Sequence, residues 1–224
     1  MANEGIDVRD SSTKPGVWPL LVLALLSAIA MAMVLQFLLI GTRSLLGAAP
    51  PKIIKIADLV SGITWGAMVG SALLLGIGAL GARARSMAIL GVVGAISGFA
   101  VSGCIYALID PQHAVYFDPL RNQTILIALL KAAEYGFLGY FLGREIDRGS
   151  ASLNGNLRIG VLIAAVFGGS LIVLAVTQSA VALPLRTGLG LVINELLLPI
   201  ACAFVAFIVG QIVATAARRD QLSQ

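Results

Sequence analysis

The chain has 224 residues, of which 58% are hydrophobic and only 12% charged, and its mean hydropathy is +0.97. A water-soluble domain carries about 25% charged residues, so this composition excludes an ordinary soluble protein, a disordered chain and a collagen-like repeat, and it indicates a membrane protein. The net charge of +4 is small, and we expect it to reflect arginines in loops on one side of a membrane rather than binding to a nucleic acid.

Windows of about 20 apolar residues predict six transmembrane helices. In chain order these spans cover residues 17–40, 57–81, 87–109, 123–143, 157–181 and 189–215. The first is longer than the apolar core of a signal peptide, so we expect it to remain in the membrane. The predicted fold is an all-α, polytopic six-helix bundle, with an N-terminal tail (1–16), a transmembrane domain (17–217) and a C-terminal tail (218–224).

The distribution of basic residues predicts that both tails are cytoplasmic. Cytoplasmic loops carry an excess of lysine and arginine, and the tail side has nine such residues against five on the other side, with Lys131 inside a span. Short loops and this charge bias are typical of a multi-pass protein of a bacterial-type inner membrane. The nine residues on the tail side are Arg9, Lys14, Arg83, Arg85, Arg144, Arg148, Arg158, Arg218 and Arg219.

The residues needed for common catalytic and metal sites are missing. His113 is the only histidine, and Cys104 and Cys202 lie in separate apolar segments without a C-x-x-C pair, so we expect no metal or haem site and no other cofactor. A phosphate-binding G-x-x-x-x-G-K-[ST] loop is also absent, which argues against ATP hydrolysis by this chain. We do not expect an enzyme; an intramembrane enzyme would need Glu134 and Glu195 as acid and base.

Small residues recur at helical spacing in the first four spans. They allow helix backbones to approach closely within a membrane. One interpretation is packing inside the bundle, and the other is a groove for a partner helix. Because the first span is least tied by short loops, its alanine stripe is the candidate for an outward-facing surface that docks a membrane protein. The stripe consists of Ala24, Ala28 and Ala32.

Three charged residues fall well inside the spans, away from the span ends, where charges are costly and often functional. Lys131, Glu134 and Tyr135 are three and four residues apart and therefore share one helical face. Glu195 precedes Pro199, which can kink its helix. These residues lie in the half of the membrane away from the tails, whereas the tail-side half is almost entirely apolar. The candidate ligand-binding residues are Trp65, Lys131, Glu134, Tyr135, Asn194 and Glu195.

Three interpretations of this outer-half cluster remain open. Lys131 could form a structural ion pair with Glu134 or Glu195 that holds the bundle together. Alternatively, the charges could line an externally open cavity that binds a small solute, with the aromatic side chains stacking on it. A proton relay through the two carboxyl groups is the third interpretation, although the tail-side half offers no further carboxylate before Glu145.

Six helices in about 220 residues, an alanine stripe on the first helix, a long first external loop (41–56) and a polar outer half resemble the substrate-capture (S) components of energy-coupling-factor transporters. The resemblance implies that the loop closes over a ligand held near the external face. It also implies that Ala24, Ala28 and Ala32 dock a transmembrane coupling subunit driven by two ATPases.

The sequence therefore predicts an integral membrane transport component that binds a small solute in an outer-half polar cavity and relies on a separate energy source. The alternative is a non-catalytic accessory or scaffold subunit of a larger membrane complex. In both cases the expected partners are the lipid bilayer and membrane proteins held through the glycine and alanine stripes.

Overall fold

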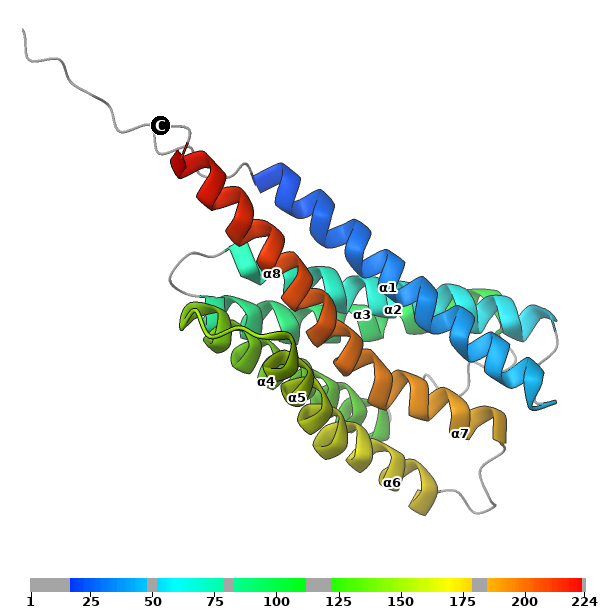
Figure 1. Ribbon diagram of the computed structural model, residues 1–224. Helices are drawn as coiled ribbons and strands as arrows, with labels where there is room; N and C mark the ends of the chain where they lie inside the picture. Colours follow the sequence, from blue (N-terminus) through cyan, green and yellow to red (C-terminus); the bar gives the residue numbers. More distant parts are fainter. Residues whose placement is uncertain (1–16, 48–51, 79–82, 112–121, 179–184, 223–224) are drawn as a thin grey trace, which may run out of the picture.

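The computed structural model describes residues 17–47, 52–78, 83–111, 122–178 and 185–222, and within these ranges all regular structure is helical (Figure 1). Four spans are single helices. They are α1 (Val17–Leu45), α2 (Lys52–Leu75, followed by the short turn η1, Gly76–Gly78), α3 (Arg83–Ile109) and α4 (Asn122–Asp147).

Each of the last two spans is interrupted by a wide helical turn of the π type. The fifth span consists of α5 (Leu153–Ile163), the π segment η3 (Ala164–Gly168) and α6 (Gly169–Gln178). The sixth consists of α7 (Leu185–Leu191), the π segment η4 (Val192–Leu197) and α8 (Leu198–Leu222). The six helical spans are long and apolar enough to cross a membrane, which confirms the predicted number and the all-helical fold of the described chain.

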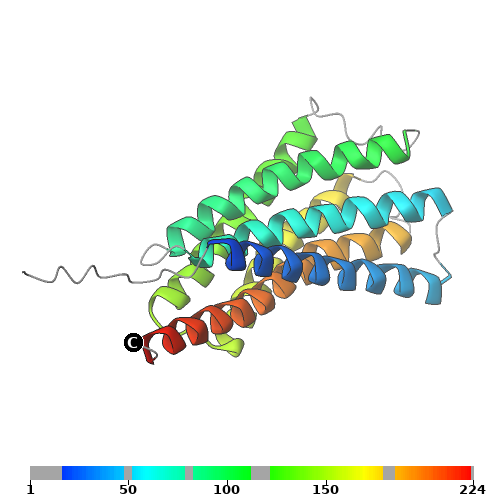
Figure 2. The same cartoon turned by 90° about the horizontal axis from the view of Figure 1, so that it is seen from above.

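The spans form an up-and-down bundle in which each helix packs against the next in the chain. The last span closes the bundle, because α8 packs against both α1 and α5 (Figure 2). The first residues of α1 and the last residues of α8 consequently lie at the same end of the bundle (Figure 1). We refer to this as the tail end, and to the opposite end as the outer end.

Glycines bring the helix backbones into direct contact. A methyl group added at Gly139 of α4 would overlap the carbonyl oxygen of Met87 in α3, and one added at Gly143 would overlap the backbone of Ala84. On the other side of α3, Gly94 lies against Ala72 of α2. Because packing rather than water drives helix association in lipid, these contacts hold α2, α3 and α4 together.

The alanine stripe of α1 belongs to the same packing. Ala24, Ala28 and Ala32 are at most 1% exposed, and the last two face Gly70 and Gly66 of α2. The expectation that this stripe faces outward is therefore wrong for the folded chain. The exposed side of α1 carries large apolar side chains instead, including Val22, Leu26, Val34 and Phe37.

The expected long first external loop is mostly helical. Residues 41–45 continue α1 and residues 52–56 begin α2, so only residues 48–51 between them lie outside the described structure. Arg43 and Asp58 join the two extensions, with Arg43 Nη1 2.6 Å from Asp58 Oδ2. This ion pair links the two helical extensions, and a cap folded over the bundle is not seen in the described residues.

The tight contact between α3 and α4 predicts a strong effect of one added methyl group. Gly139→Ala should destabilise the protein by about 1–3 kcal/mol, because its Cβ overlaps the Met87 carbonyl. Thermal unfolding in detergent, followed by circular dichroism, measures the change. The matched control is Gly169→Ala, at a helical position with no atom within 4 Å of the new methyl group; equal stability of the two variants would contradict the packing argument.

Candidate functional site

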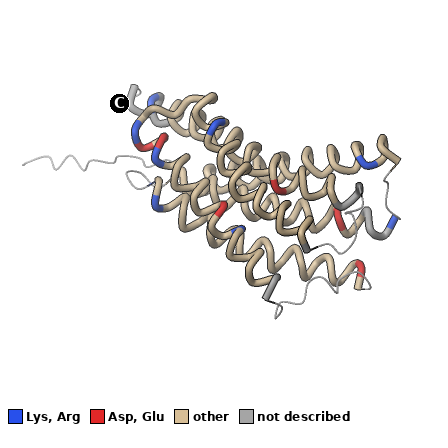
Figure 3. The backbone as a smooth tube through the Cα atoms, turned by 90° about the horizontal axis from the view of Figure 1, so that it is seen from below, with Lys and Arg blue, Asp and Glu red and all other residues tan. Residues whose placement is uncertain are grey.

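Lys131 lies at the centre of a buried ionic cluster. Its Nζ is 2.8 Å from Glu134 Oε2 on the next turn of α4 and also forms an ion pair with Glu195 of η4. Lys131 is 3% exposed and Glu134 is fully buried. Figure 3 shows few charged residues in the middle of the bundle, whereas most others lie toward its ends. The predicted ion pair is therefore present and includes both carboxylates.

Two aromatic rings complete the surroundings of the Lys131 ammonium group. Nζ is 5.8 Å from the ring centre of Trp65 in α2 and 5.7 Å from that of Tyr135 in α4. The two rings meet edge to face, with their centres 5.8 Å apart. Cation–π attraction operates at these distances and strengthens when water is excluded. The ammonium group thus has two carboxylates and two rings as neighbours, supplied by α2, α4 and η4.

The cluster is not fully satisfied. Within the described chain, Glu134 Oε1 and the Tyr135 hydroxyl are buried without a hydrogen-bond partner. With all three groups ionised, two carboxylates face one ammonium group, leaving one negative charge in excess. A buried polar atom without a partner costs about 1–3 kcal/mol, so Glu134 Oε1 and the Tyr135 hydroxyl keep hydrogen-bonding capacity that the described chain does not use.

The π segments position Glu195. In η4 the hydrogen-bond register is widened, and the N–H of Leu198 donates to the carbonyl of Ile193. Gly168, the last residue of η3, lies directly against the carbonyl of Glu195, where a larger residue could not fit. The predicted disturbance near Pro199 thus takes the form of a π turn, a feature common at functional sites.

Two further polar pairs continue from the cluster toward the outer end. Asn194 accepts a hydrogen bond from Gln36 of α1, with Nε2 and Oδ1 3.2 Å apart. Two helical turns farther along α1, Arg43 pairs with Asp58 and its guanidinium group lies over Gly190 of α7. We call these pairs and the ionic cluster the polar column. Gln36 and Arg43 are not among the candidate residues predicted from the sequence; their spacing of seven residues, which places them on one helical face, is the signal that could have indicated them.

The structure brings five of the six candidate residues into direct contact, and the sixth, Asn194, precedes Glu195 in η4. The cluster is closed rather than open to the outside: the Lys131 side chain is 4% and the Glu195 side chain 13% exposed. Two cavities between α3 and α4 are lined almost entirely by apolar surface and do not include these residues.

Comparison with known proteins finds no matching family model, no similar curated protein and no similar solved structure. Fold alone does not determine function. The geometry and chemistry of the polar column are therefore the features of this chain that bear on its function.

We expect removal of the Lys131 charge alone to destabilise the protein more than removal of all three charges of the ionic cluster. Lys131→Met should lower the free energy of unfolding by about 3–5 kcal/mol, because it leaves two buried carboxylates without a counter-charge. The triple variant Lys131→Met, Glu134→Gln, Glu195→Gln has no formal charge there and should recover much of the loss. Unfolding in mixed micelles compares the three proteins. A single variant as stable as the unmodified chain would show that the cluster does not hold the bundle.

Proposed function

We propose that this chain is a non-catalytic membrane transport component that captures a small solute at the ionic cluster. The observation that carries the proposal is the buried Lys131 between two carboxylates, with free hydrogen-bonding atoms on Glu134 and Tyr135. A bundle that needed only stability would be served as well by apolar residues, since a buried ion pair brings little net stabilisation.

The polar column gives the site a direction. It leads from Arg43 and Asp58 at the outer end, through Gln36 and Asn194, to Lys131, which is nine residues or ~14 Å along α4 from its first residue. Toward the tail end, the same region of the core is filled by apolar side chains. They include Val69, Leu138, Leu142, Ala206 and Val209, all fully buried. This asymmetry supports capture from the outer side rather than a continuous channel.

The charge balance favours a solute with a positively charged group that donates hydrogen bonds, such as a primary or secondary amine. When both carboxylates are ionised, the one excess negative charge in a medium of low dielectric attracts a cation strongly. Glu134 Oε1 and the Tyr135 hydroxyl could accept its hydrogen bonds, and the Trp65 ring could stack on a flat portion of the molecule.

The proposal places both tails in the cytoplasm of a bacterial-type inner membrane, as the lysine and arginine distribution favours. Energy would come from a separate ATPase, because the sequence has no phosphate-binding loop. Solute binding by this chain and energy supply by a separate ATPase agree with the resemblance to substrate-capture components. The docking surface would have to differ from the buried alanine stripe of α1.

Solute binding should be detectable as thermal stabilisation of the purified protein. In a screen of small amines and matched neutral compounds, we expect an amine to raise the unfolding midpoint and Glu195→Gln to abolish that rise. A ligand present at 100 times its dissociation constant adds about 2.7 kcal/mol, which is easily measured.

The matched control is Glu145→Gln, which makes the same chemical change at the tail end, where Glu145 interacts with Ser150 and Arg148. This variant should keep the ligand response. Stabilisation by an amine that survives in Glu195→Gln would remove the cluster from the binding site.

The closed packing of the cluster favours the second candidate function, an accessory or scaffold subunit of a larger membrane complex. A pulldown in mild detergent, with identification of the co-purifying proteins, separates the two. Recovery of ATPases with a coupling membrane protein would support transport. Recovery of a different assembly, together with no response to any amine, would favour the accessory subunit.

A further inference from the structure

A second binding surface lies on the side of α4 opposite the ionic cluster. It is an apolar cavity of about 490 Å³ between α3 and α4, which we call the α3/α4 groove. Ile89 is 51% and Phe137 50% exposed, so the groove opens to the surface that faces lipid. Its lining consists of Ala88, Ile89, Val92, Ala132, Ala133, Gly136, Phe137 and Tyr140.

Small residues create the groove and larger ones flank it. Gly136 sits directly beneath Val92 of α3, and the alanines leave the space between the helices unfilled. Nearer the tail end, Gly139 brings α4 directly against the backbone of Met87 in α3. The α3/α4 groove is therefore narrow and apolar, and it is open along one side.

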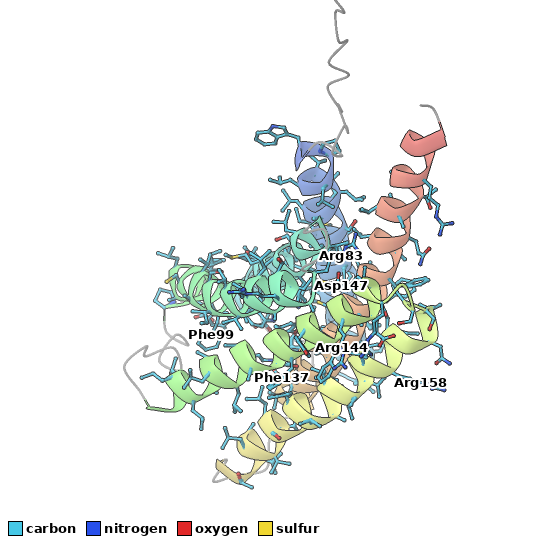
Figure 4. All side chains as sticks on the ribbon, turned by 90° about the vertical axis from the view of Figure 1, so that its left-hand side faces the viewer. Arg83, Phe99, Phe137, Arg144, Asp147 and Arg158 are labelled. Carbon is cyan, nitrogen blue, oxygen red and sulfur yellow. The ribbon has the colours of Figure 1, made fainter. Side chains whose placement is uncertain are left out.

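Two arginines lie just beyond the tail end of the groove, on the same faces of α3 and α4 as the residues that line it. Arg85 is three residues before Ala88, and Arg144 is four residues after Tyr140, so each lies one turn past the lining. Both are exposed, and neither has a carboxylate partner among the described residues. Arg83 differs, because it donates to the Ile77 carbonyl and lies 3.9 Å from Asp147 (Figure 4).

We propose that the α3/α4 groove binds one acyl chain of an anionic phospholipid, whose phosphate is held by Arg85 and Arg144. Guanidinium groups suit phosphate oxygens in charge and geometry, and basic pockets between transmembrane helices bind lipid headgroups. From Ala132 to Arg144 the helix rises ~18 Å, close to the ~15 Å of half a bilayer core. An acyl chain whose phosphate is held by the two arginines is therefore long enough to fill the groove as far as Ala132, at the end of the groove away from the tail end. The site is independent of the proposed solute site.

The test is titration of the detergent-purified protein with dioleoyl-phosphatidylglycerol and dioleoyl-phosphatidylcholine, with bound lipid counted by native mass spectrometry. The unmodified chain should bind one phosphatidylglycerol in preference to phosphatidylcholine. The double variant Arg85→Gln, Arg144→Gln should weaken that binding by about tenfold or more, because each arginine near the surface contributes severalfold.

The charge-matched control is Arg158→Gln, Arg218→Gln, which removes two exposed arginines from the same end of the bundle, with Arg158 on α5 (Figure 4). This variant should keep the preference; an equal loss would overturn the proposal in favour of general surface charge. Ala133→Phe fills the groove from the membrane side and should reduce binding of the same lipid severalfold. Unchanged affinity in that variant, with its helical content intact, would show that no acyl chain occupies the groove.

Discussion

The burial of one ammonium group between two carboxylates is the constraint on which the arrangement of this bundle depends. Lys131 and Glu134 come from α4, Glu195 comes from η4, and Trp65 of α2 covers the ammonium group. Removing such charges from water costs several kcal/mol for each ion, and their attraction offsets this only when the geometry is close. The three elements must therefore meet at this depth, and the bundle has little freedom to slide one helix past another.

Glycine makes that meeting possible at the level of the backbone. Gly98 of α3 lies against the Trp65 ring, and Gly168 of η3 lies against the carbonyl of Glu195. A side chain at Gly98 would press on the Trp65 ring, and one at Gly168 would displace the backbone of Glu195. The ionic cluster thus depends on the small-residue stripes. The stripes set the distances between helices, and those distances determine whether the charges can pair.

The composition and hydropathy of the chain were enough to predict six helical spans and the residues of the cluster, because long apolar runs and intramembrane charges are strong signals. The pairing of Gln36 with Asn194, 158 residues away, depends on which helices become neighbours, and no local pattern carries that information. For the same reason, the prediction that the alanine stripe of α1 faces outward was wrong. An alanine stripe fits a partner helix and the chain's own α2 equally well, and Gly66 and Gly70 of α2 provide the matching surface.

The distribution of tight contacts also determines how a solute could reach a closed cluster. The helix α4 is locked to α3 through Gly139 and Gly143, whose backbones touch Met87 and Ala84, so movement of α4 would break backbone contacts along the pair. The segment α7–η4 is held differently: α7 has seven residues, and η4 already has a widened register. Tightening the π turn to an α turn would rotate Asn194 and Glu195 relative to α8. Under the proposed function, we therefore expect access to Lys131 to come from a change in α7–η4 rather than from movement of α4 against α3.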